Sequence, residues 1–345
     1  MNQILRTVML VAFFVSGFAV NSLAQEQDPK KIKGATICGD CHKAAHATWK
    51  EMKHQTNFLE FHKLADTKAV LKKLGLRSAK RGICITCHYT AQQEEGKRRA
   101  KAISGVSCES CHGASAEWFD VHSNYGKTAS GEKATKETES AEHKKMRLES
   151  TAAAGMIRPD QPYLLTQNCF QCHTVPNEEL VNKGGHTPGS DFELVAWSSG
   201  EVRHNFQQTE EKENRLAARD YDPANRKRLL YVMGQILDLE YALRGLAEAT
   251  TEGTYADAMK NRAMAAADKL KAIQGKASNT NIQAILDAAG GASLAPNNKD
   301  GLVAVADQIR TNAQAFGASN DGSSLAAIGA MIPGADQYKG AVYTP

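Results

Sequence analysis

The sequence predicts a mostly α-helical protein in two parts, a first domain over residues 25–205 and a helical bundle over residues 206–345. The first observation is that Cys-x-x-Cys-His occurs four times before residue 174. The second is that aromatic residues make up only 6% of the chain, and long apolar runs are rare in the first part. The third is an Ala-rich last third with apolar residues at helical spacing. The bundle can therefore build its own core, whereas the first domain needs a large apolar group to complete one.

The segment Met1–Ala24 has the pattern of a secretory signal peptide. Arg6 supplies the positive charge, and the apolar run Val8–Val20 is too short to span a bilayer comfortably. Small residues at Ser22 and Ala24 fit a cleavage site near Ala24. We therefore expect an exported, periplasmic protein that does not require a membrane, with a retained N-terminal anchor as the alternative.

The four motifs use all eight cysteines of the chain: Cys38 and Cys41, Cys84 and Cys87, Cys108 and Cys111, Cys169 and Cys172. Two cysteines three apart, followed at once by His, form the attachment signature of a c-type haem. The thiols bond to the haem, and the adjacent imidazole becomes the proximal ligand of the iron. The predicted proximal ligands are His42, His88, His112 and His173.

A zinc ribbon or a set of redox disulfides would also use Cys-x-x-Cys pairs, and the gap from Cys87 to Cys108 fits such a ribbon. Neither kind of site needs a His after each pair. The motifs therefore predict four covalently attached haem c groups and a haem-packed multihaem cytochrome c domain.

The charge of the first domain is strongly basic. Between Lys30 and His112 there are 17 Lys and Arg residues against 7 Asp and Glu residues. Four haems would bring eight carboxylates, so this excess is expected to compensate the haem propionates. No basic and aromatic groove pattern is present, so the sequence predicts no nucleic-acid partner.

Further histidines are candidates for the distal side of the irons. His46 lies one helical turn after His42 on the same face, so it cannot reach the far side of that haem. His54 lies past this helix and is better placed to ligate another haem. His122 follows His112 by ten residues, too few to wrap easily around its own haem, so it too is expected to serve a neighbour.

Residues 126–150 are rich in Lys, Glu, Thr, Ser and Ala, with almost no large apolar side chain. This composition predicts an exposed, flexible insertion, and His143 within it is not expected to be a ligand.

The chain changes character at Asp222, after which it contains neither Cys nor His. Asp222 and Pro223 predict the start of a helix. Further helices are expected over residues 254–273, 279–289 and 300–316, and a short one before Pro333, as a structural cap or an association surface.

The stretches Cys38–Lys43 and Val106–Gly113, with Trp49, His54 and His122, resemble the tetrahaem cytochrome c-554 family of nitrifying bacteria. The resemblance covers roughly residues 32–173. It implies haems that stack in pairs, the first with the third and the second with the fourth. It also implies that His122 ligates the first iron and His54 the fourth, and that electrons come from a hydroxylamine oxidoreductase.

After His173 the chain departs from the family, so the remaining ligands follow only from the same pattern. His186 comes 13 residues after His173 and would serve the second haem, and His204 would then complete the third. The family's second haem is five-coordinate, so an open second haem is the alternative.

These patterns favour an electron carrier over an enzyme, and no catalytic residue is assigned. We expect a periplasmic tetrahaem c-type cytochrome that transfers electrons through stacked haems, each with two His ligands. Its partners would be a donor, such as a dehydrogenase or a hydroxylamine-oxidoreductase-like enzyme, and a downstream acceptor. The alternative is a haem enzyme that acts on a small nitrogen or oxygen species, such as nitric oxide or hydroxylamine, at a five-coordinate second haem.

Overall fold

The computed structural model describes residues 27–202 and 222–340. The expected signal peptide and His204 lie outside these residues. Most of the described chain is helical, which confirms the expectation of a mostly α-helical protein. Within the described residues, no helix combines the length and the apolar character needed to cross a membrane.

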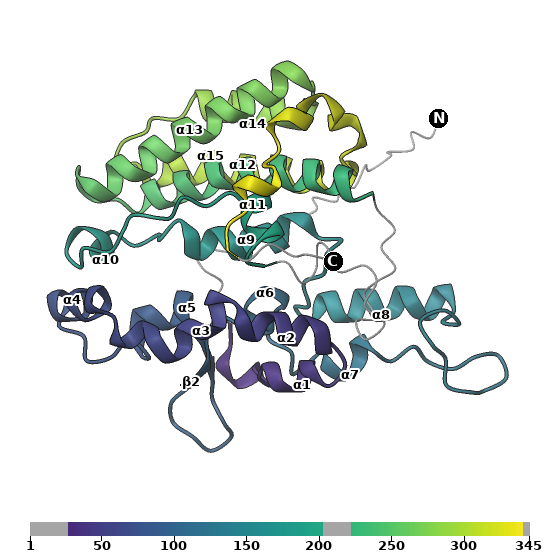
Figure 1. Cartoon of the computed structure of the whole chain (residues 1–345). Helices are drawn as coiled ribbons and strands as arrows, with labels where there is room; N and C mark the ends of the chain where they lie inside the picture. The colour runs from purple at the N-terminus through teal and green to yellow at the C-terminus, as the bar shows by residue number, and fades with distance from the viewer. Residues whose placement is uncertain (1–26, 203–221, 341–345) are drawn as a thin grey trace, which may run out of the picture.

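The first three motifs lie on short helices in the lower layer of Figure 1. These α-helices are α1 (Ala35–Gly39), α2 (Lys43–Glu51), α3 (Lys53–Glu60), α4 (Ala65–Leu74), α5 (Ile85–His88), α6 (Cys108–His112) and α7 (Phe119–His122). Three 3-10 turns accompany them, namely η1 (Pro29–Lys31), η2 (Phe61–Lys63) and η3 (Gly82–Cys84). A hairpin of β1 (Thr90–Gln92) and β2 (Lys101–Ser104) projects from this layer. Its strands are antiparallel, with Thr90 opposite Ser104.

Most of residues 126–150 are exposed, as expected, but a regular helix, α8 (Ala141–Ala153), begins inside this segment. The Ser140 side chain caps it by accepting a hydrogen bond from the backbone N–H of His143. Arg147 on α8 forms a two-fold ion pair with Glu139, with N···O distances of 2.6 and 2.7 Å, and both side chains are buried. An ion pair between residues eight apart stabilises this helix, which the scarcity of large apolar residues did not predict.

The fourth motif lies at the end of α9 (Pro162–His173), which α10 (Glu178–Asn182) and α11 (Leu194–Ser199) follow. The C-terminal part then contains α12 (Pro223–Ala247), α13 (Thr254–Lys276), α14 (Thr280–Gly290), α15 (Lys299–Ser319), η5 (Ser323–Met331) and η6 (Ala335–Gln337). These elements confirm the helices that the sequence predicts here. The Asp222 side chain accepts from the Asn225 N–H, and Pro223 occupies the first turn, as expected at a helix start.

Helix α9 lies between the two layers and belongs to the core of the upper one (Figure 1). It packs against α12 and α15 on one side and against α5 and α6 on the other. Tyr163 on α9 donates to the buried carboxylate of Glu240 at 3.1 Å, and the Gln167 amide donates to Tyr241 Oη at 2.8 Å. Phe170, inside the fourth motif, is 1% exposed within the same apolar cluster. The composition of the chain changes near residue 205, but this core runs across that point.

Candidate haem-binding site

None of the eight cysteines forms a disulfide. The third and fourth motifs each lie within one α-helix, whereas the first spans the end of α1 and the turn that leads into α2, and the second spans η3 and α5. In the first motif, the His42 N–H donates to the Cys38 carbonyl at 2.8 Å. In the third, a capping box between Ser107 and Ser110 begins the turn. A helical turn places the first Cys and the His on one face, so a single flat group can bond to both.

Three motif histidines each face a histidine from another part of the chain. The ring centroids are 6.4 Å apart for His42 and His122, 6.4 Å for His54 and His173, and 6.3 Å for His88 and His186. Two imidazoles bound on opposite sides of one metal at about 2 Å have centroids about 6 Å apart. Each pair therefore has the spacing that one iron between two imidazoles requires. The sequence predicts these same pairs as ligands, and ligation itself stays a prediction.

In three of these six imidazoles, Nδ1 is hydrogen-bonded to a protein group. Nδ1 of His122 donates to the Phe119 carbonyl, and Nδ1 of His186 donates to the Thr187 carbonyl at 2.8 Å. Nδ1 of His173 hydrogen-bonds the Ser190 hydroxyl at 2.8 Å. A bond at Nδ1 fixes the tautomer and the ring orientation and leaves Nε2 for a metal.

His112 is held in the same way, because its Nδ1 donates to the Ile157 carbonyl at 3.0 Å. Its expected partner, His204, lies outside the described residues. Among the described residues, the structure therefore brings together three of the four expected pairs.

Burial keeps these imidazoles neutral. The pKa of His88 is lowered to about 4 and that of His173 to about 3, mainly because burial removes water from the rings. Burial also lowers the pKa of His54, His112 and His122. Only a neutral imidazole can bind a metal, so five of the candidate ligands are in the required protonation state at neutral pH.

Aromatic side chains restrict three of the rings. Phe61 stacks on His88 with centroids 3.9 Å apart, and Phe192 stacks on His173 at 4.3 Å. Trp118 contacts His122 edge-on at 5.3 Å. Such contacts limit rotation of the imidazoles and so preorganise the sites.

The motifs meet in pairs. The Cys38 thiol lies beside the Cys108 thiol, and this neighbour, with burial, raises the pKa of Cys38. The Cys172 thiol lies beside the Cys87 thiol and hydrogen-bonds the Thr86 carbonyl, inside the second motif, at 3.9 Å. The first motif therefore lies beside the third and the second beside the fourth, as the resemblance implies. A zinc ribbon would instead group the cysteines of the second and third motifs. No group of three or more His, Cys, Asp or Glu side chains in the described ranges has the geometry of a metal site.

A further contact joins the two pairs. The Asn168 side chain, just before the fourth motif, donates to the Cys111 carbonyl of the third motif at 2.6 Å. In space the motifs therefore follow the order first, third, fourth, second.

Comparison with known proteins bears on the class of protein. The model of the family described as cytochrome c554 and c-prime matches residues 37–113. Cytochrome c-554 of Nitrosomonas europaea is 26% identical to the chain over 169 residues. Both comparisons support a c-type cytochrome. The matched region covers 47% of this chain and 65% of that relative, and no solved structure matches significantly.

One residue of the site that sequence reasoning missed is Glu109, between the two cysteines of the third motif. Its side chain is 1% exposed, and its carboxylate accepts hydrogen bonds from the backbone N–H groups of Lys33, Gly34 and Ser115 at 2.7–2.9 Å. Glu109 thereby ties the segment before the first motif to the third motif. The two positions between the cysteines vary freely in the signature, so the sequence carried no signal for this role.

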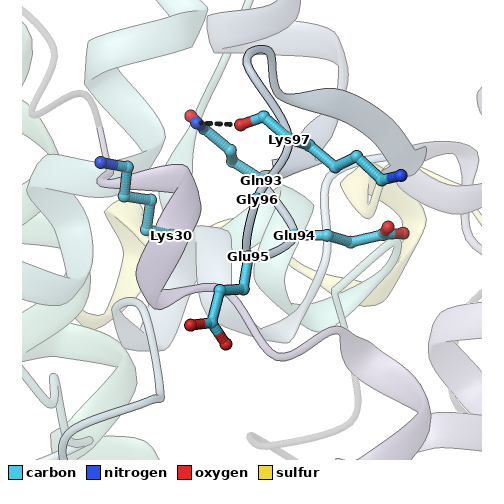
Figure 2. Close-up of a pocket in the computed structure, with 6 residues that line it drawn as sticks. All are labelled: Lys30, Gln93, Glu94, Glu95, Gly96 and Lys97. Carbon is cyan, nitrogen blue, oxygen red and sulfur yellow. Dashed lines mark hydrogen bonds between the residues drawn. The ribbon is translucent and has the colours of Figure 1, made fainter.

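A cavity of about 380 Å³ lies at the base of the β1–β2 loop and is lined by Lys30, Gln93, Glu94, Glu95, Gly96 and Lys97 (Figure 2). The Glu94 and Lys97 side chains extend to the same side of the loop, Lys30 lies on the opposite side, and Gln93 donates to the Lys97 carbonyl. None of the lining residues is a candidate haem ligand. We assign no function to this cavity.

Proposed function

We propose that the chain is a periplasmic tetrahaem c-type cytochrome that transfers electrons between redox protein partners. The observation that carries the proposal is the set of three imidazole pairs with centroids 6.3–6.4 Å apart. Haem iron, when bound, takes up and releases one electron without a change of ligands. Export through the Met1–Ala24 segment agrees with covalent haem attachment, which takes place outside the cytoplasm.

The proposed site residues are those of the four motifs and the histidines expected opposite them. The eight motif cysteines would hold the haems, and His42, His88, His112 and His173 would be the proximal ligands. His122, His186 and His54 would be the distal ligands of the first, second and fourth irons, and His204 that of the third. The protein's contribution is to hold the rings through their Nδ1 bonds and aromatic contacts, so little reorganisation accompanies each electron.

The contacts between motifs suggest a route. The Cys38–Cys108, Asn168–Cys111 and Cys87–Cys172 contacts place successive sites side by side. An electron that enters at the first or the second haem would then leave at the opposite end. The donor would be a dehydrogenase or a hydroxylamine-oxidoreductase-like enzyme.

The competing function is an enzyme of small nitrogen or oxygen species at the second haem. That chemistry needs an iron with a free position. The imidazole of His186 lies across from His88 and occupies the space that an open site would leave to a substrate. We therefore favour electron transfer.

Haem stoichiometry tests the proposed function. Pyridine haemochrome analysis is expected to give four covalent haems per chain, because all four motifs are complete. A Cys84→Ala/Cys87→Ala variant should give three, which calibrates the measurement. A value of two or three for the unaltered protein would contradict the proposal.

A further inference from the structure

We propose that the surface around η2 and α4 is a docking surface for an acidic redox protein that exchanges electrons with the second haem. This surface, the basic face, is defined by Lys63, Lys68, Lys73 and Lys80, with the exposed apolar residues Leu59 and Leu64. The inference rests on the proposed function and adds the place of contact and the chemistry of the partner.

The basic face carries an uncompensated positive charge. Residues 61–81 contain seven Lys and Arg residues and one Asp. Lys63, Lys68 and Lys80 form no ion pair with any residue in the described ranges. Burial lowers the pKa of His62, and the charges of Lys80, Lys63 and Lys68 lower it further. The three ammonium groups are therefore all close enough to His62 to affect its charge. A clustered charge of one sign steers a partner of the opposite sign.

Apolar side chains accompany the lysines. Leu59 is 63% exposed and Leu64 is 49% exposed, and they lie on either side of Phe61 in the chain. Lys80 lies over the Phe58 ring, with its Nζ 4.0 Å from the ring centroid. A protein interface combines an apolar centre with a polar rim, and an exposed leucine gives a protein partner a contact that a small anion would not use.

The basic face borders both imidazoles of the second site. Phe61, half-buried on η2, stacks on His88 at 3.9 Å, so one side chain separates the surface from this ligand. The Lys73 ammonium group lies beside Gly185, the residue before His186. A Cβ atom built on Gly185 would be 2.5 Å from Lys73 Nζ. A partner that covers the basic face would therefore sit against the second haem.

The second motif is also at one end of the spatial order of motifs. Figure 1 shows α4 at one end of the lower layer and α8 at the opposite end. A partner bound at the α4 end would be near the second haem. A partner bound at the α8 end would be far from it. Position and charge together indicate an acidic protein as the occupant.

The test uses the complete haem-loaded protein and reduced flavodoxin as an acidic one-electron probe. Stopped-flow absorbance gives the second-order rate of haem reduction at low and at high salt. The triple variant Lys63→Glu/Lys68→Glu/Lys80→Glu reverses the charge of the basic face. The matched control, Lys127→Glu/Lys136→Glu/Lys144→Glu, makes the same change in net charge at exposed lysines around α8.

For the unaltered protein, the rate should fall about 10-fold from low to high salt, because screening removes the steering. At low salt the basic-face variant should be about 10-fold slower than the unaltered protein, and the control less than about 2-fold slower. Equal losses in the two variants, or a loss in the control alone, would overturn the docking surface. The neutral variant Lys63→Gln/Lys68→Gln/Lys80→Gln, with an unchanged haem spectrum, should show an intermediate loss. Failure of dithionite to reduce the haems reversibly would instead overturn the proposed function, and the docking surface with it.

Discussion

Replacement of His186 by alanine is expected to create one carbon monoxide site per chain in a protein whose reduced form otherwise binds none. The His186 ring lies 6.3 Å from the His88 ring, on the far side of the proposed second iron. Its side chain is only half-buried, and it follows Gly185, so a small ligand can reach the position that the imidazole leaves. The spectral change on adding carbon monoxide to the reduced variant measures the number of open irons.

The control for this experiment is His46→Ala. His46 packs against the Trp49 ring at 5.4 Å and faces no motif histidine across a 6 Å gap, so its loss should open no iron. Rapid, stoichiometric carbon monoxide binding by the unaltered protein would refute the role of His186. It would restore the alternative of a small-molecule enzyme.

Substitution of Phe170 by alanine is expected to cost roughly 3–5 kcal/mol of unfolding free energy, the range for a buried aromatic side chain. Phe170 is 1% exposed, and it contacts the Phe192 ring at 5.2 Å within the core that α9 shares with the C-terminal helices. Denaturation followed at the haem absorbance band measures the loss. For the same reason, a chain ending at Tyr221 is expected not to accumulate with its fourth haem site intact.

Ile85→Ala is the matched control, because Ile85 occupies the same position in the second motif but is only half-buried and lies outside that core. Its substitution should cost less. Equal costs for Phe170→Ala and Ile85→Ala, together with a normal haem spectrum for the chain ending at Tyr221, would show that residues 222–345 form an independent unit.

The C-terminal helices were predictable because their signals are local. Asp222 and Pro223 begin α12, and the expected helix over residues 254–273 is the core of α13. Helix α8 was not predicted, because the ion pair that stabilises it joins Glu139 and Arg147, eight residues apart. The packing of α9 against the C-terminal helices was also not predicted from the sequence, because the residues that join them, such as Tyr163 and Glu240, lie far apart along the chain.

The candidate site also has a part that the sequence predicts and a part that it does not. Each Cys-x-x-Cys-His motif is complete within five residues, so its chemistry can be read from the sequence. The distal candidates His54, His122 and His186 followed from spacing and resemblance. The groups that orient the rings were not predicted, because tertiary contacts bring Phe61, Phe192 and Ser190 to their partners.

The central claim is that every iron of this protein is held between two imidazoles and serves electron transfer alone. Low-temperature electron paramagnetic resonance of the fully oxidised protein tests it most directly, because it separates low-spin, six-coordinate iron from high-spin, five-coordinate iron. We predict low-spin signals that account for four irons per chain and no high-spin signal. A high-spin signal equivalent to one iron per chain would contradict the claim.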